Sequence, residues 1–143
     1  METSQKLEQI LNHPKPLSDT QKKAVLSDKD HIRIIAGAGA GKTETLTRRI
    51  VYNLIHEAVD PSAIVAFTFT DKAAQSMKSR VYDRLRSLGR DDICYRIGDL
   101  YIGTIHGYCH RILVDYFGYG SYDAFDANQE MAFLMRVGWE LGL

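Results

Sequence analysis

Cysteine, proline and tryptophan are scarce in this sequence: it has two, three and one of them among 143 residues. The two cysteines, Cys94 and Cys109, cannot build a disulfide framework, and their spacing matches no zinc motif. No apolar run reaches the roughly 18 residues of a membrane-spanning helix, and the N-terminal residues lack the apolar core of a signal peptide. We therefore expect free thiols and a cytoplasmic protein that does not enter a membrane.

A net charge is also missing, because 18 lysines and arginines balance 18 aspartates and glutamates. Overall charge therefore neither favours nor excludes a nucleic-acid partner. The charge is segregated: residues 72–90 contain six basic residues and one acidic residue, whereas residues 117–143 contain four acidic residues and one arginine. A basic face of this kind is either a solvated helix surface or a contact for a nucleic-acid backbone.

What the sequence does contain is the 45% hydrophobic content of an ordinary globular domain, in which apolar strands alternate with amphipathic helices. We expect helices over residues 2–12, 18–26, 42–57, 106–116 and 128–141, one further helix with Ala74, Met77, Val81, Leu85 and Leu88 on one face, and strands over 31–35, 64–69 and 98–105. The apolar run 64–69 is typical of a strand buried on both faces. Alternating strands and helices predict an α/β fold with a parallel sheet, whose strand ends share one ligand-binding edge.

A glycine-rich turn follows the first expected strand. Residues 36–43 read Ala-Gly-Ala-Gly-Ala-Gly-Lys-Thr, which has the spacing of a phosphate-binding loop with Ala36 at the first position in place of glycine. In such a loop, bare backbone amides and the start of a helix face phosphate oxygens, Lys42 reaches the β and γ phosphates, and the Thr43 hydroxyl binds Mg²⁺. The predicted phosphate-binding residues are Ala36, Gly37, Ala38, Gly39, Ala40, Gly41, Lys42 and Thr43. The alternative interpretation is a flexible glycine hinge.

Four blocks together resemble the UvrD/Rep family of superfamily 1 DNA helicases. Residues 17–25 resemble its Q motif, 36–43 its Walker A motif, 67–77 its motif Ia and 103–113 its motif Ib. The resemblance implies the N-terminal part of the first motor domain, an incomplete RecA-like P-loop NTPase sheet with flanking helices. It divides the chain into an N-terminal extension (1–16), a motif-bearing core (17–116) and the start of a segment that leads to an accessory domain (117–143).

The resemblance also implies roles for individual residues. Gln21 bonds the adenine edge, and Glu44 stands at a nucleotide-binding position where many relatives carry an arginine that packs on adenine. The implied positions on single-stranded DNA are Thr68, Phe69, Thr70, Thr104 and His106, with Phe69 offering its ring to a base. Competing interpretations make Gln21 a solvated helix residue, Phe69 a core residue, and the His106–His110 pair a metal site.

In the family, hydrolysis depends on an adjacent Asp–Glu pair in motif II, and the 143 residues contain no such pair. Asp91 and Asp92 are expected in a loop that no strand precedes. We expect Lys42 and Thr43 to serve a parent ATP-dependent 3′–5′ helicase with ATP, Mg²⁺, single-stranded DNA and the remaining helicase domains as partners. The chain by itself is expected to bind nucleotide without hydrolysing it, and to self-associate through exposed strand edges.

Two other functions share the phosphate loop. One is a non-catalytic P-loop module that binds nucleotide or a partner, and the other is a small P-loop kinase. The blocks at 68–74 and 104–113 favour the helicase over the kinase.

Overall fold

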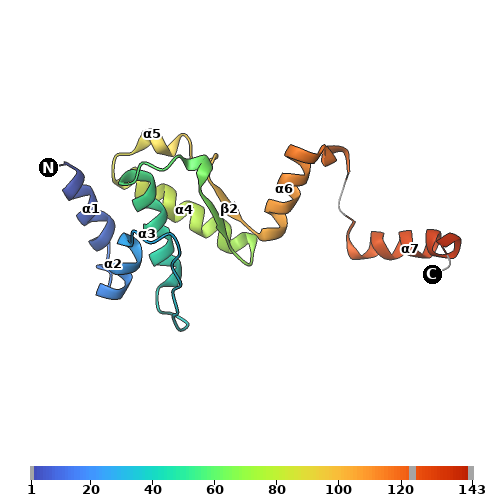
Figure 1. Cartoon of the computed structure of the whole chain (residues 1–143), viewed down its shortest axis with the longest axis horizontal. Helices are drawn as coiled ribbons and strands as arrows, with labels where there is room; N and C mark the ends of the chain where they lie inside the picture. Colours follow the sequence, from blue (N-terminus) through green and yellow to red (C-terminus); the bar gives the residue numbers. More distant parts are fainter. Residues whose placement is uncertain (1, 123–124, 142–143) are drawn as a thin grey trace. The chain divides into compact units, whose positions relative to one another are not determined.

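The computed structural model describes residues 2–122 and 125–141, and in the two terminal helices it describes side chains only from residue 4 and up to residue 138. Residues 1–105 form one compact unit, and residues 106–143 form a second (Figure 1).

The first unit contains six helical segments and two strands among the residues described. In chain order these are α1 (Glu2–Asn12), α2 (Asp19–Leu26), α3 (Lys42–Ile55), the 3₁₀ turn η1 (Pro61–Ala63), β1 (Val65–Phe67), α4 (Asp71–Ser87), α5 (Asp91–Cys94) and β2 (Tyr101–Gly103). The helices predicted over 2–12, 18–26 and 42–57 are confirmed to within two residues at each end. Ser18 caps α2: its hydroxyl accepts from the backbone N–H of Gln21, and the Gln21 side chain accepts in return from the Ser18 N–H.

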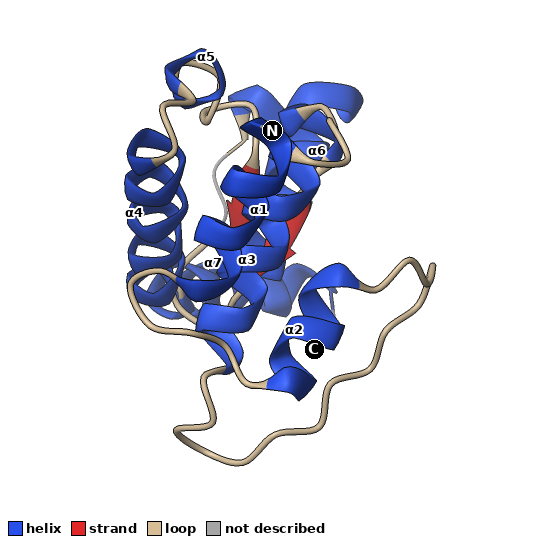
Figure 2. Ribbon diagram, turned by 90° about the vertical axis from the view of Figure 1, so that its left-hand side faces the viewer, coloured by secondary structure: helices blue, strands red, loops and turns tan. Residues whose placement is uncertain are grey.

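Helix α3 lies at the centre of the unit, packed against α1, α2 and α4 (Figure 2). Its buried face includes Ile50, Val51 and Leu54. The five apolar residues predicted on one face of α4, from Ala74 to Leu88, are all buried. Apolar spacing of three and four residues therefore identified the face that packs on the core.

The two strands pair in parallel, with Val65 opposite Tyr101, Ala66 opposite Ile102 and Phe67 opposite Gly103. Helix α4 connects them and packs on β2. Ala66 and Ile102 point into the core, but Val65 and Phe67 are 39% and 44% exposed. The prediction of a strand buried on both faces is therefore wrong, because only one face of β1 is covered.

Two further expectations are also wrong. Residues 31–35 form no strand, and the side chain of Ile35 is 86% exposed. β-branched residues favour a strand only where a neighbour supplies hydrogen bonds and packing, and the sheet of the described residues contains β1 and β2 alone. Asp91 and Asp92 open the short helix α5 and do not lie in a loop.

The second unit contains α6 (Ile105–Phe117), the 3₁₀ turn η2 (Tyr119–Ser121) and α7 (Ala127–Leu141). The helices predicted over 106–116 and 128–141 are confirmed. Helix α6 buries none of its side chains. Across the part of the chain that is described, no helix is both long and apolar enough to cross a bilayer.

Candidate functional site

The loop before α3 is shaped by two glycines with left-handed backbone. Gly39 has φ of +74° and Gly41 has φ of +78°. These φ values are unfavourable in free energy for any residue that has a side chain. A Cβ on Gly41 would lie 2.8 Å from Nε2 of Gln21, so this position also lacks room for a side chain. The chain then enters α3 at Lys42, where the first N–H groups of the helix have no intrahelical acceptor. The loop and the helix start together offer backbone donors suited to an anion.

The Lys42 side chain folds back over this loop. Its Nζ donates to the carbonyl oxygens of Ala36, at 3.0 Å, and Gly37, at 2.8 Å. An ammonium group has three donors, so these two bonds leave it able to donate to a phosphate oxygen as well. Thr43, the next residue, is exposed at the start of α3.

Gln21 joins α2 to the loop. Its Oε1 accepts from the backbone N–H of Ser18 at 2.9 Å, and its Nε2 donates to the carbonyl of Ala40 at 3.0 Å. The structure thus brings Gln21, from the predicted Q motif, next to the glycine-rich loop. A side-chain amide has two N–H donors and two acceptor lone pairs, so Gln21 retains capacity for a further partner.

Two cavities border the loop, and Gln21 and Ala40 contribute to both. One has a volume of about 350 Å³ and is lined by Ser18, Thr20, Gln21, Ala24, Ile34, Ile35, Ala36, Ala40, Lys42 and Thr45. The other has a volume of about 470 Å³ and is lined by Pro14, Lys15, Pro16, Leu17, Gln21, Gly39, Ala40, Gly41, Glu44, Arg48 and Arg84. Both lie within the 300–1,000 Å³ that is typical of small-molecule sites.

Glu44 is held in the wall of the larger cavity by two arginines. Its Oε1 accepts from Nε of Arg48 at 2.7 Å and from Nη2 of Arg84 at 2.5 Å. Burial acts to raise the pKa of Glu44, but the hydrogen bond from Arg48 and the charges of Arg84, Arg48 and Arg80 outweigh it and hold the pKa below its usual value. Glu44 is therefore ionised at neutral pH and bridges α3 to α4.

Arg48 is almost completely buried, at 1% exposure, and all three of its guanidinium nitrogens are bonded. Besides Glu44, it donates to the carbonyls of Ile10, Leu11 and Lys15, at 3.2, 2.7 and 2.7 Å. Sequence reasoning missed Arg48 and the inward turn of Arg84. The Glu44–Arg48 spacing of four residues, with the acid first, was a signal that could have identified the first of these.

The predicted DNA-contacting residues that lie in the first unit gather at one edge of the sheet. The Thr68 N–H donates to the Gly103 carbonyl at 2.8 Å, and Thr70 caps α4 by accepting from the Ala73 N–H at 3.2 Å. Thr104 directly follows β2, and its carbonyl accepts from the Tyr101 hydroxyl at 2.9 Å. Phe69 is fully exposed at 104%, so its interpretation as a core residue is wrong.

His106 lies in α6 of the second unit and is exposed. Within residues 2–122 and 125–141, no three His, Cys, Asp or Glu side chains gather in a way that would hold a metal ion.

The sequence also matches known proteins. The sequence model described as the UvrD/REP helicase N-terminal domain matches residues 17–134. The chain is 41% identical over 98 residues to the ATP-dependent DNA helicase SRS2 of Saccharomyces cerevisiae, and 42% identical over 97 residues to the ATP-dependent DNA helicase PcrA of Bacillus subtilis; each match covers 68% of this chain. It is 34% identical over 132 residues, 89% of its length, to the ATP-dependent DNA helicase UvrD1 of Mycobacterium tuberculosis.

The chain spans only a small share of these relatives, 8% of SRS2, 12% of PcrA and 16% of UvrD1. The match to the family nevertheless extends from the Q motif, through the glycine-rich loop and both strands, into the second unit. This chain belongs to the UvrD/REP helicase family, in which it matches the N-terminal domain.

Proposed function

We propose that the chain is the ATP-binding part of an ATP-dependent DNA helicase that moves along single-stranded DNA in the 3′ to 5′ direction. The observation that carries the proposal is the loop from Ala36 to Thr43, with two left-handed glycines, Lys42 folded over it and Gln21 bonded to it. The names of the relatives, which are ATP-dependent DNA helicases, support the same activity. In this proposal the first unit is part of a P-loop NTPase sheet that further strands complete.

The loop residues suit the triphosphate tail of ATP. The N–H groups from Gly37 to Glu44 would donate to phosphate oxygens, and Lys42 would exchange its loop carbonyls for the β and γ phosphates. The exposed Thr43 hydroxyl would bind Mg²⁺, and Gln21 would use its remaining amide groups on the adenine edge. When bound, ATP supplies the phosphoanhydride bond whose hydrolysis drives movement.

The chain by itself would bind Mg-ATP without turnover. Hydrolysis needs a carboxylate that positions Mg²⁺ and another that orients the attacking water. The Asp91–Asp92 pair opens α5, where Asp92 is bonded to Arg90 through both oxygens, at 2.8 and 2.7 Å. Asp92 is therefore committed to an ion pair, and the proposal assigns the catalytic carboxylates to other residues of the parent helicase.

The sheet edge formed by Thr68, Phe69, Thr70 and Thr104 would face single-stranded DNA, and His106 would join it in the assembled motor. The full exposure of Phe69 supports this, because an exposed aromatic ring is available to stack on a base. The remaining helicase domains would then be the physical partners of this part. The cytoplasmic location expected from the sequence stays a prediction.

Thermal unfolding with and without Mg-ATP tests nucleotide binding. A ligand at 100 times its dissociation constant stabilises a protein by about 2.7 kcal/mol. Saturating Mg-ATP should therefore raise the melting temperature of the chain. Lys42→Ala should remove most of this shift, whereas Lys29→Ala should keep it because the side chain of Lys29 is 77% exposed. No shift for the unmodified chain at millimolar Mg-ATP would contradict the proposal.

The helicase activity is tested on a longer protein that contains this chain and the remaining motor. Its ATP hydrolysis should rise on addition of single-stranded DNA, and Lys42→Ala should abolish it. ATP hydrolysis that single-stranded DNA does not stimulate, or that persists in Lys42→Ala, would exclude the motor function. The proposal that the chain binds nucleotide would not be affected.

A further inference from the structure

The larger of the two cavities beside the phosphate loop combines three kinds of surface. Pro14, Pro16 and Leu17 offer apolar atoms, Gln21 offers an amide, and Arg84 brings a guanidinium from α4. Gly39, Ala40 and Gly41 of the predicted phosphate loop form another side. Flat apolar contacts, one amide and one planar cation are the chemistry that recognises a heterocyclic base next to a phosphate site.

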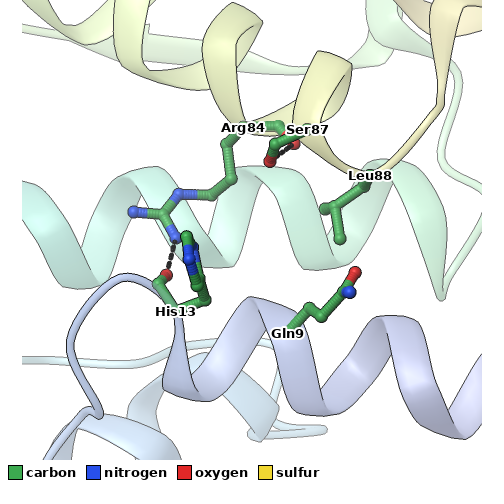
Figure 3. A pocket seen from close by; sticks show the side chains of 5 residues that line it. All are labelled: Gln9, His13, Arg84, Ser87 and Leu88. Atoms are coloured by element: carbon green, nitrogen blue, oxygen red, sulfur yellow. Dashed lines mark hydrogen bonds between the residues drawn. The ribbon is translucent and has the colours of Figure 1, made fainter.

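Arg84 is fixed in this wall from two directions. Its Nη2 donates to Glu44 at 2.5 Å. Its Nη1 donates to the carbonyl of His13 at 2.7 Å, and Figure 3 marks this bond with a dashed line. The side chain is 12% exposed. Burial lowers the pKa of Arg84 from its usual value, but the ion pair with Glu44 opposes this, and an arginine stays charged at neutral pH.

The other arginine of this cavity, Arg48, cannot have the same role. It is 1% exposed, and its guanidinium is bonded to Glu44 and to three backbone carbonyls. Both guanidinium contacts of Arg84 are made through its terminal nitrogens, at the edge of the group. The faces of the Arg84 guanidinium are therefore not occupied by these hydrogen bonds.

We propose that Arg84 lies against the nucleobase of a bound nucleotide and that Glu44 positions it there. Arg84 is thus a binding residue contributed by α4, and Glu44 is a positioning residue contributed by the phosphate-loop helix. A planar guanidinium stacks on a heterocycle, whereas a lysine ammonium at the same place does not. This inference rests on the proposed binding of nucleotide at the Ala36–Thr43 loop.

The test compares a ligand that has a base with one that lacks it. Isothermal titration of the chain with Mg-ATP and with Mg-tripolyphosphate gives the ratio of the two affinities for each variant. Arg84→Lys should lower the affinity for ATP about 3- to 30-fold, the range expected for a lost cation–π contact, and change the affinity for tripolyphosphate by less than about twofold. Lys42→Ala should instead weaken both ligands.

Tripolyphosphate binding shows that each variant is folded at the loop. Glu44→Gln removes the carboxylate charge that pairs with Arg84 and keeps an oxygen that can accept hydrogen bonds. It should lower the ratio of ATP to tripolyphosphate affinity in the same direction as Arg84→Lys. An unchanged ratio in Glu44→Gln would contradict the role given to Glu44. An unchanged ratio in Arg84→Lys would overturn the role of Arg84.

A measurement on the unmodified chain does not depend on the folding of any variant. Arginine labelled with ¹⁵N should show a ring-current shift at the Arg84 Nε–H with Mg-ATP and no such shift with Mg-tripolyphosphate. If ATP binds and this signal does not move, the inference fails although the proposed function stands. If neither ligand binds, the proposed function fails and the inference fails with it.

Discussion

Gly41 is the residue at which backbone conformation and side-chain packing limit the site together. Its φ of +78° places it in the left-handed region, and its Cα faces the Nε2 of Gln21. The same Nε2 donates to the carbonyl of Ala40. A side chain at position 41 would therefore disturb both the loop and the residue proposed to contact adenine.

Gly41→Ala should destabilise the chain by about 1 to 2 kcal/mol, because alanine is unfavourable in the left-handed conformation. The loop or the Gln21 side chain must also move away from the new methyl group. Chemical denaturation measures this change. Gly37→Ala is the matched control, since a Cβ on Gly37 would meet no atom within 4 Å. Equal stability of the two variants would show that the loop does not hold Gly41 in this conformation.

At this scale the sequence predicted a glycine-rich turn before a helix, and the structure has such a turn, with left-handed backbone at Gly39 and Gly41 before α3. The phosphate chemistry of this turn stays a prediction. The sequence could not predict the environment of Glu44. From the sequence, a carboxylate near the start of a helix is interpreted as a solvated or capping residue. The bond between Glu44 and Arg84 joins residues 40 positions apart and depends on how α4 packs against α3. Residue spacing does not encode a contact of that range.

At the scale of elements, Arg48 joins α1 and the following loop to α3. Its guanidinium supplies donors to Ile10 and Leu11 in the last turn of α1, and to Lys15 beyond it. Carbonyls in the last turn of a helix lack intrahelical donors and carry the negative end of its dipole, so a buried cation there is doubly favourable. Arg49, the next residue, caps the end of α2 in the same way, because its Nη1 donates to the carbonyls of Ala24, Val25 and Ser27.

Arg48→Ala should cost about 3 to 5 kcal/mol of unfolding free energy, because it removes a buried guanidinium that is bonded to Glu44 and to the carbonyls of Ile10, Leu11 and Lys15. The Leu11 carbonyl would keep its bond from the Leu17 N–H. Urea denaturation followed by circular dichroism measures this loss. Arg111→Ala is the control: Arg111 also pairs with a carboxylate four residues away, Asp115, but is 52% exposed, and its loss should cost less than about 1 kcal/mol. Similar losses for the two variants would contradict the structural role of Arg48.

Apolar periodicity predicted the helices and their buried faces because a helix is determined by its own residues and by one contact face. The strand predicted over 31–35 failed for the opposite reason. Its hydrogen-bond partners have to come from elsewhere in the chain, and the described residues provide none for this segment. The strand predicted over 64–69 is observed only as β1, Val65–Phe67, which pairs on one side, with β2.

At the scale of the whole molecule, many large apolar side chains lie at the surface. In the first unit, Ile34, Ile35, Val65 and Phe67 are between 39% and 86% exposed. In the second unit, Tyr116, Phe117 and Met135 are between 66% and 81% exposed. Apolar surface of this kind, together with a two-stranded sheet, favours contacts with other protein.

We therefore predict that the chain self-associates at micromolar concentrations, and sedimentation velocity at increasing concentration measures this. Val65→Lys should shift the equilibrium towards monomer, because a lysine on an edge strand opposes further strand pairing. Ser76→Lys adds the same charge to an exposed position of α4 and should have little effect. If the two lysines act alike, charge alone explains the change and the strand edge has no part in it.

The contacts of Arg48 have a practical meaning for anyone shortening this protein. The family match begins at residue 17, yet the acceptors at Ile10, Leu11 and Lys15 all precede it. A version cut at the conventional boundary would keep a positively charged side chain in the interior and delete the oxygens that solvate it. Poor yield from such a truncation would then reflect a missing counterpart to one arginine, and restoring α1 should recover it.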